Sequence, residues 1–363
     1  MIKVLQLPGS LSRANGRMSV IMNIYRQLDR TKIQFDFLGT GVSGDTYIDE
    51  IQKLGGKVCL VPKNELNYHS VRSAIRKMLK LESYDCIHYH AISLWGAALG
   101  IAKHQGVRVI VHSHSTRYTL GNSWLKTIRN RMFSLNIFLY ADRLAAVSTD
   151  AGKALFGRRE FMLIPNVINF KRFKYSSNAR SEVRKKFKIS DDIHLIGHVG
   201  RFSPEKNHNY MIHCFKKLWE QDHQYRLMLV GDGPLINDMK LLVNKLNLTS
   251  MIIFVGPITD VSAFYSAFDA FWLPSVFEGL PTVGLEAQAA GLPLFVSNRV
   301  TSDLQIHPIE YLSIDGDNSQ DAWVNSTLKT KLIRNTCFQD ELGKSMYHFP
   351  HVLQLWINLY NFI

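Results

Sequence analysis

Residues 274–287 read PSVFEGLPTVGLEA. The apolar run Ala270–Leu273 before them predicts a buried strand, the Gly and Pro residues predict a turn, and a helix is expected to begin near Thr282. The amide groups and dipole at the start of such a helix favour a phosphate or sugar hydroxyls. Glu278 and Glu286 would be ~12 Å apart along a helix, at about 1.5 Å per residue. Glycosidase carboxylates are separated by roughly 5 Å to under ~10 Å, so these two suit opposite ends of one elongated ligand better than a shared glycosidic bond.

The pattern around this segment is typical of parallel α/β architecture, in which short apolar runs alternate with helical patterns. Strand-like runs in the first half are Lys3–Leu7, Phe35–Leu38, Lys57–Val61, Cys86–Tyr89, Arg108–Val111 and Leu144–Val147. A second series is His194–Val199, Arg226–Val230, Ile252–Val255, Ala270–Leu273 and Leu294–Val296. We therefore expect two doubly wound domains, 1–170 and 191–345, a basic linker at 171–190, and a terminal helix within 346–363.

The net charge of +13 is unevenly distributed over the 363 residues. Residues 1–170 hold 23 Lys/Arg against 11 Asp/Glu (+12), residues 171–190 hold 8 against 1 (+7), and residues 191–363 hold 12 against 18 (−6). A basic first half suggests an anionic partner such as nucleic acid, a membrane surface or a phosphorylated lipid, although solubility and a solvated linker are the more general explanation of charge runs.

Several classes of protein are disfavoured by what the sequence lacks. No apolar run reaches the roughly 18 residues of a membrane-spanning helix, and the first residues do not read as a signal peptide. The 4 cysteines lie far apart, which argues against a disulfide framework or a structural zinc site and fits a reducing cytoplasm. No Gly-x-Gly-x-x-Gly or Walker A motif is present, so an NAD enzyme or a P-loop NTPase is disfavoured.

Four histidines stand at two predicted strand ends, as His88-x-His90 and His112-x-His114. Period-two alternation points the two imidazoles of each pair to the same side, as a metal site requires. No cluster of Asp, Glu or Cys residues completes a ligand set nearby. We therefore expect histidines that line a cleft, and no metal.

A strand-to-helix loop reads GRFSPEKN at residues 200–207. An arginine and a lysine in such a loop can hold a diphosphate, the first as a fork and the second as a point charge. Taken by itself, the loop could equally be a surface turn, and each glutamate of 274–287 could be a helix cap or a surface residue.

Three motifs together resemble the retaining glycosyltransferases of family 4, which have the GT-B fold: GRFSPEK at 200–206, GDGP at 231–234, and the two glutamates followed by AGLP at 290–293. IMNIYR at 21–26, FDFL at 35–38 and HSHS at 112–115 are similar to the branch that makes bacterial capsular and exopolysaccharides. The resemblance covers about residues 1–310.

The resemblance implies two Rossmann-like domains that face a central cleft, with the C-terminal helix crossing back to the first. It implies transfer of a hexosyl unit, with retention, from a nucleotide sugar, expected to be a UDP-sugar. The implied acceptor is a saccharide or a polyprenyl-diphosphate-linked saccharide in cell-surface polysaccharide biosynthesis. Neither a metal nor another cofactor is implied.

The resemblance also assigns roles to residues. Glu286 would hold the ribose and Glu278 the donor sugar. Arg201 and Lys206 would neutralise the leaving diphosphate, which supplies the positive site that the transition state needs, and His114 would face the reacting sugar. Further donor contacts are expected at Asn15, Gly16, Gly200, Ile258, Gly279, Leu280, Pro281 and Thr282.

The expected acceptor contacts are Arg17 and His112. Two departures from the family pattern affect this half: Asn15-Gly16 stands where two glycines are usual, and residues 166–169 read NVIN, without the usual Gly and Asp. Two alternatives therefore stay open, a non-catalytic partner or binding module of the same fold, and a nucleotide-sugar epimerase. The epimerase would need further carboxylates in the first domain, where we find no convincing candidate.

Basic and aromatic residues are interleaved from Arg117 to Phe133. This pattern suits a peripheral contact with the anionic inner face of the cell membrane, and an ordinary core helix equally well. We expect a cytoplasmic protein, peripheral at that face. Nucleic acid is not an expected partner, because no recognition motif accompanies the basic charge.

Overall fold

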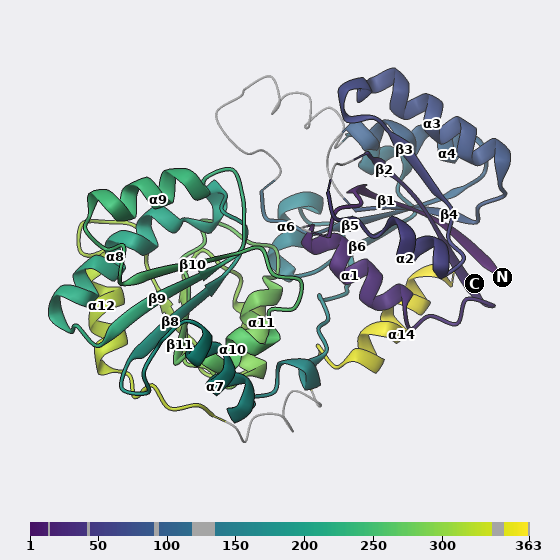
Figure 1. Ribbon diagram of the computed structural model, residues 1–363. Helices are drawn as coiled ribbons and strands as arrows, with labels where there is room; N and C mark the ends of the chain where they lie inside the picture. Colours follow the sequence, from purple (N-terminus) through teal and green to yellow (C-terminus); the bar gives the residue numbers. More distant parts are fainter. Residues whose placement is uncertain (14, 42–43, 91–93, 118–134, 336–344, 362–363) are drawn as a thin grey trace. The chain divides into compact units, whose positions relative to one another are not determined.

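The computed structural model describes residues 1–13, 15–41, 44–90, 94–117, 135–335 and 345–361. The chain divides into two compact units (Figure 1). The first comprises Met1–Val167 and Phe349–Ile363, and the second comprises Ile168–His348. Each unit contains one sheet whose strand pairs are parallel, which confirms the predicted pair of doubly wound sheets.

The first unit has a seven-stranded sheet in the order β3-β2-β1-β4-β5-β6-β7. Its strands are β1 (Ile2–Ser10), β2 (Ile33–Thr40), β3 (Val58–Val61), β4 (Cys86–Tyr89), β5 (Arg108–Ser113), β6 (Arg143–Ala146) and β7 (Met162–Leu163). Its helices are α1 (Gly16–Tyr25), α2 (Ile48–Lys53), α3 (Tyr68–Leu81), α4 (Ala98–His104), α6 (Thr149–Phe156) and α14 (Phe349–Tyr360). β1 and β4 lie in the middle of the sheet, so their side chains are buried on both faces, as parallel strands require.

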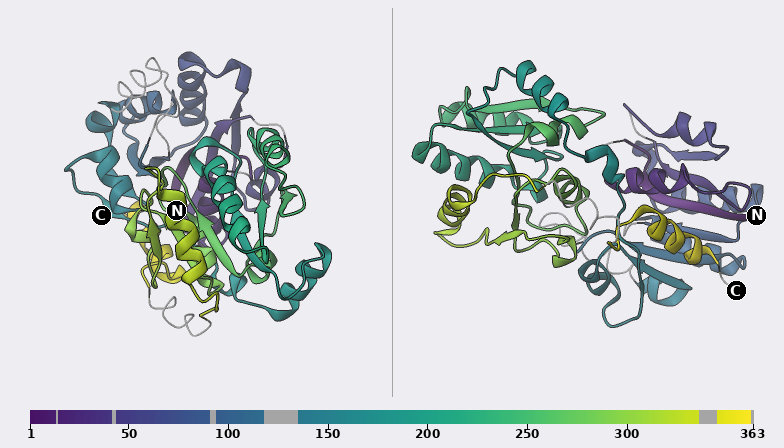
Figure 2. Two further views of the ribbon diagram at one scale, coloured as in Figure 1. Left: turned by 90° about the vertical axis from the view of Figure 1, so that its left-hand side faces the viewer. Right: turned by 90° about the horizontal axis from the view of Figure 1, so that it is seen from below.

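The terminal helix α14 packs against the first unit, although the whole second unit separates it from β7 along the chain. Trp356 and Tyr360 are fully buried there, and their ring centroids lie 6.5 and 5.5 Å from that of Phe35 on β2. Two further views show α14 beside the strands of this unit (Figure 2). Burial of each large apolar side chain contributes about 1.5–3 kcal/mol, so α14 is a structural part of the first unit.

The second unit has a six-stranded sheet in the order β10-β9-β8-β11-β12-β13. Its strands are β8 (His194–Val199), β9 (Tyr225–Val230), β10 (Ile252–Gly256), β11 (Ala270–Leu273), β12 (Leu294–Ser297) and β13 (Glu310–Leu312). Its helices are α7 (Ser177–Lys186), α8 (His208–Gln221), α9 (Ile236–Lys245), α10 (Ser262–Ala267), α11 (Thr282–Ala289) and α12 (Ser319–Lys329).

The basic segment 171–190, which we expected to be a linker, is instead part of the second unit. It contains α7, and the guanidinium of Arg184 on this helix is buried. Arg184 donates to the backbone oxygen of Ala267 at 3.1 Å and pairs with Asp269 at 3.1 Å. The positive charge is therefore neutralised inside the unit, which composition by itself does not reveal.

Candidate functional site

The loop from β11 to α11 forms one part of the candidate site. α11 starts at Thr282, as the sequence predicts, and its N-cap residue is Pro281. Proline has no side-chain group that could cap the N–H groups of the first turn. The positive end of the helix dipole therefore lies next to the loop that contains Glu278, while Gly279 and Leu280 are buried behind it.

Glu278 forms an ion pair with Lys206, which ends the 3-10 helix η4 (Pro204–Lys206). The Lys206 Nζ atom lies 2.5 Å from Glu278 Oε1, and the buried Ser275 hydroxyl donates to the same oxygen at 2.9 Å. The two side chains are 15% and 14% exposed. The attraction between the charges is stronger at such a largely buried position than in water, and each side chain keeps a small exposed surface.

Glu286 lies about one turn into α11 and accepts a hydrogen bond from the hydroxyl of Tyr265, at 2.6 Å. Burial raises the pKa of the Glu286 carboxyl to about 7, against the lowering effects of the Tyr265 hydrogen bond and of the charges of Arg172 and Lys206. The Tyr265 ring is buried and stacks on Phe271, with centroids 5.5 Å apart. The second unit thus brings Lys206, one of the two cations that the sequence singled out, close to both carboxylates.

The loops after β8 and β9 touch backbone to backbone at this edge of the sheet. Gly231 has φ +141°, and a Cβ there would lie 2.0 Å from the carbonyl oxygen of Gly200. A Cβ at Gly233 would lie 2.5 Å from the backbone oxygen of Phe202, whose N–H donates to Asp232 O at 3.0 Å. Glycine is required at 231 and 233 because of this close approach.

Two further predicted donor residues are exposed on loops of this edge. Arg201 follows β8, and Ile258, with 36% of its side chain exposed, follows β10. The carboxyl edge of a parallel sheet is where ligands bind in doubly wound folds, so both positions are open to a ligand.

In the first unit, Asn15 caps α1. Its side-chain oxygen accepts from Arg17 N–H at 3.1 Å, and its side-chain amide donates to Ser10 O at 3.1 Å. The backbone of Asn15 is extended, with φ −92°, so this residue replaces a glycine without a left-handed conformation. Gly16 opens the helix and is exposed, while the guanidinium of Arg17 donates to His90 O at 3.0 Å.

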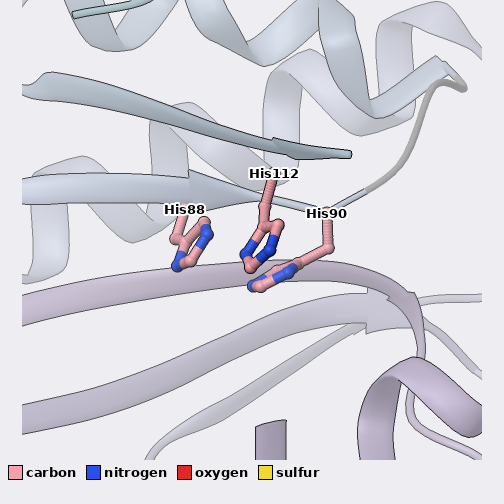
Figure 3. Close-up of side chains that lie close together, drawn as sticks. All are labelled: His88, His90 and His112. Atoms are coloured by element: carbon pink, nitrogen blue, oxygen red, sulfur yellow. The ribbon is translucent and has the colours of Figure 1, made fainter. Parts of the chain in front are cut away.

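The four strand-end histidines form one cluster in the first unit, as the period-two alternation predicts. Figure 3 shows the rings of His88, His90 and His112 side by side. His90 Nδ1 lies 2.9 Å from His114 Nε2, and His90 Nε2 lies 2.6 Å from the side-chain oxygen of Gln6 on β1. Burial lowers the pKa of each of the four histidines well below its ordinary value, and for His88, His90 and His114 the neighbouring imidazoles act in the same direction.

The cluster has nitrogen atoms close enough to suggest a metal site, but its rings stack. The rings of His88 and His112 are within 4° of parallel with centroids 5.4 Å apart, and those of His88 and His90 are 3.9 Å apart. Their candidate ligand atoms lie within 4.8 Å of one another. Nitrogen ligands of a tetrahedral zinc stand about 3.4 Å apart at bonds of about 2.0–2.1 Å. Both nitrogens of His90 already have partners, so a metal would require the rings to turn and these hydrogen bonds to break.

The predicted acceptor role of His112 disagrees with its position. The side chain is 1% exposed and is enclosed by His88, His114 and Trp356. Neither ring nitrogen has a hydrogen bond of ordinary geometry within the described residues, although the backbone of Ile164 is near enough to raise the pKa slightly. His112 is therefore a packing residue in this structure, because a buried ring offers no surface to an acceptor.

Sequence reasoning missed four residues that hold the predicted ones: Ser275, Tyr265, Gln6 and Tyr360. The first belongs to the quoted motif and could have been noticed there. The other three are distant in sequence from their partners, so no local pattern indicated them.

The basic and aromatic membrane segment falls mostly on residues 118–134, which lie outside the described residues. Among the helices that the structure describes, none combines the length and apolar character needed to cross a bilayer.

Comparison with known proteins covers both units. Residues 15–172 match the family model "Glycosyltransferase Family 4", and residues 179–307 match "Glycosyl transferases group 1". EpsF of Bacillus subtilis (strain 168), named as a glycosyltransferase, is 34% identical over 310 residues, or 82% of this chain and 80% of EpsF. An Escherichia coli UDP-Gal:alpha-D-GlcNAc-diphosphoundecaprenol alpha-1,3-galactosyltransferase is 29% identical over 239 residues, or 62% of this chain and 60% of that enzyme.

Solved structures match the whole chain. HepE of Anabaena, in complex with UDP and glucose, superposes with a TM-score of 0.79 at 16% identity and covers 99% of both chains. WaaG, a glycosyltransferase involved in lipopolysaccharide biosynthesis, superposes with a TM-score of 0.76 at 17% identity and covers 100% of both. At these identities the likeness shows the fold.

Proposed function

This chain belongs to glycosyltransferase family 4 and has the GT-B fold, and from that premise we propose that it transfers a hexosyl unit from a UDP-sugar to a lipid-linked saccharide during polysaccharide biosynthesis. The transfer proceeds with retention and needs no metal. The observation that carries the proposal is the grouping of Lys206, Glu278 and Glu286 at the start of α11.

Lys206 and Glu278 change partners when donor binds. In the structure the ammonium and the carboxylate satisfy each other. We assign Lys206, together with the exposed Arg201, to the diphosphate, and Glu278 to hydroxyls of the donor sugar. Amide groups from Gly279 to Thr282 add hydrogen bonds to the sugar and the β-phosphate. The positive charges of Lys206 and Arg201 stabilise the negative charge that develops on the leaving diphosphate in the transition state, so the chain's own cations serve where other transferases use a metal.

Glu286 binds the ribose. A carboxylate accepts two hydroxyl hydrogen bonds, which fits the paired hydroxyls of a ribose ring. The base then lies near Ile258, on the loop after β10. Asn15 and Gly16 at the start of α1 contact the phosphates, and His114 contacts the transferred sugar. HepE supports UDP as the nucleotide, since it was solved with UDP.

The acceptor is assigned to the first unit, where Arg17 remains the candidate contact. The galactosyltransferase from Escherichia coli supports a lipid-diphosphate acceptor, since its name specifies one. The high density of Lys and Arg before residue 171 supports a peripheral contact with an anionic membrane, where such an acceptor would be held.

A thermal-shift panel of nucleotides and nucleotide sugars, run with EDTA, tests the proposal. A ligand that binds the folded state raises the melting temperature by mass action. We expect a shift with UDP and with at least one UDP-sugar that EDTA does not abolish. Stabilisation by adenine or guanine nucleotides but not by UDP would contradict the donor assignment, and a UDP shift lost in EDTA would contradict metal independence.

A further inference from the structure

A chain of hydrogen bonds runs from His114 through the core of the first unit to the terminal helix α14. His114 Nε2 meets His90 Nδ1 at 2.9 Å, and His90 Nε2 meets Gln6 Oε1 at 2.6 Å. The Gln6 amide donates to the Tyr360 hydroxyl at 2.9 Å, and that hydroxyl lies 2.7 Å from His88 Nδ1. All four partners of His114 in this chain are buried, whereas His114 itself is partly exposed at its end.

Gln6 sets the direction in which protons are donated along this series of hydrogen bonds. A neutral imidazole has one N–H and one bare nitrogen, and an amide has an oxygen that accepts and an NH₂ that donates. With Gln6 Oε1 facing His90, His90 must carry its proton on Nε2, and its bare Nδ1 accepts from the Nε2–H of His114. The amide at the other end donates to Tyr360, so the Tyr360 proton points to His88.

The surroundings keep every member of the chain neutral. Burial holds the pKa of His90 and of His114 well below the ordinary range, and the positive guanidinium of Arg17 acts in the same direction. Burial also keeps Tyr360 protonated, because it raises the pKa of its hydroxyl. Trp356 closes the cluster, with its ring centroid 5.9 Å from that of His90. Because every member of this series of hydrogen bonds is neutral, each orientation of the Gln6 amide allows one consistent arrangement of protons along it.

We propose that Gln6, His90 and Tyr360 are positioning residues that hold His114 as the Nε2–H tautomer and present its bare Nδ1 to the donor sugar as a hydrogen-bond acceptor. This inference rests on the proposed function, which places His114 at the transferred sugar. A partner that fixes the tautomer and orientation of an imidazole is what makes the ring effective in a catalytic site. The terminal helix thereby contributes to the active site through Tyr360 without contacting substrate.

The first unit also contains a matched control for the test. Gln34 on β2 is also buried and donates to a tyrosine hydroxyl, that of Tyr25, at 2.6 Å. This second Gln–Tyr pair lies in the same unit and has no link to His114 in the hydrogen bonds described above. Gln6→Met and Tyr360→Phe can therefore be compared with Gln34→Met and Tyr25→Phe, which remove equivalent groups.

The main readout is the tautomer of His114 in the full-length protein labelled with ¹⁵N-histidine. The His114→Gln variant identifies its signals. In the wild type we expect a protonated nitrogen at Nε2 and a bare one at Nδ1, and in Gln6→Met we expect a mixture or exchange of the two. The Gln34→Met spectrum should match the wild type. A wild-type His114 already protonated at Nδ1, or signals that Gln6→Met and Tyr360→Phe leave unchanged, would overturn the proposal.

Turnover is the second readout, followed as UDP release from UDP-glucose and UDP-galactose. We expect Gln6→Met and Tyr360→Phe to lower kcat about tenfold with little change in KM for donor, as loss of a supporting contact does. The control pair should keep wild-type kcat. Failure of the proposed function looks different, because the wild type would then release no UDP from either sugar while the tautomer signals still report on Gln6.

Discussion

The two units hold their polar side chains in different ways at the carboxyl edges of their sheets. In the first unit four neutral imidazoles are packed against one another and against Trp356. In the second unit a lysine and a glutamate form a charged pair that keeps some exposed surface, near a carboxyl whose pKa burial raises to about 7. The first arrangement fixes the orientation of the imidazole rings, whereas the second contains charged groups that can exchange each other for a ligand.

This difference indicates that charged groups in the second unit supply the strength of ligand binding, whereas buried neutral groups in the first unit fix the orientation of side chains. Exposed or half-exposed charges respond to ligand, salt and pH. Buried neutral groups do not respond to ligand, salt or pH over the physiological pH range. A substitution near them acts by altering the orientation of their side chains.

The largest effect is expected at the charged pair. Lys206→Ala should lower turnover by roughly 10²–10³-fold, because it removes a preorganised positive group from the leaving diphosphate. Steady-state rates of UDP release measure this. Lys217→Ala is the control, since Lys217 pairs with Asp321 at 2.8 Å on the surface of the same unit. Wild-type turnover in Lys206→Ala would end the assignment.

A smaller effect is expected for Glu286→Gln, which should weaken UDP binding by roughly 10–100-fold, because hydrogen bonds to a charged group are worth about 1.5–3 kcal/mol. Wild-type affinity should also rise as pH increases through 7, since the ribose hydroxyls need the ionised carboxylate. The unliganded protein should show the opposite sign: a carboxyl with a raised pKa contributes stability that is lost as pH rises from its ordinary value of 4.5 to about 7.

Calorimetric titration of UDP between pH 6 and pH 8 measures the first sign, and Glu286→Gln should flatten that profile. Thermal melts between pH 5 and pH 7, compared between the wild type and Glu286→Gln at each pH, measure the second sign, since the histidine contribution is common to both proteins. Glu220→Gln, at an exposed carboxylate paired with Lys216, should leave both pH profiles as in the wild type. A wild-type affinity that falls as pH rises would contradict the ribose role.

Acid should affect the first unit more steeply than the second. A histidine whose folded pKa is lowered contributes stability that is present above its unfolded pKa, about 6.5, and is lost as pH falls below it. Among the described residues the first unit has His88, His90, His112 and His114 in this state, and the second has His198 and His208. Each further proton costs about tenfold in the folding equilibrium per pH unit.

Hydrogen exchange between pH 6.5 and pH 5, corrected for the intrinsic rate, compares the two units within one sample. Amides of β4 should lose protection faster than those of β8 as pH falls. Equal slopes would show that the histidine cluster of the first unit is not kept neutral by burial.

The smallest effect concerns the membrane. Arg117 is exposed in the basic first unit, and Arg117→Ala should weaken binding to anionic vesicles about fivefold, since each basic residue near such a surface contributes about 1 kcal/mol. Lys245→Ala, at an exposed lysine of the second unit, should bind as the wild type does. Flotation with phosphatidylserine vesicles at two salt concentrations measures this, and binding that salt does not reduce would contradict an electrostatic contact.

The sequence predicted most of the two sheets, because buried parallel strands are short apolar runs that stand out from helical patterns. It did not predict β7 or β13, which have 2 and 3 residues. Strands this short carry no periodic signal and form because a neighbouring strand offers its edge.

The candidate site was predictable where its residues form a local motif and hidden where it depends on distant partners. Glu278 and Glu286 could be found from 274–287, but the Tyr265 hydroxyl that meets Glu286 comes from another helix. The burial of His112 could not be found either, because it follows from Trp356 and the packing of α14. The place of the basic segment 171–190 in the second unit was hidden for a related reason, because composition does not distinguish the buried Arg184 from exposed lysines.

The return of α14 to the first unit has a consequence for synthesis on the ribosome. The second unit is one uninterrupted segment, so its core needs nothing from residues 349–360. The first unit begins earlier but must wait, with Phe35 and the histidines uncovered, until Trp356 and Tyr360 emerge. The half of the protein that is translated first is therefore finished last, and a nascent chain released before residue 356 would carry an open core.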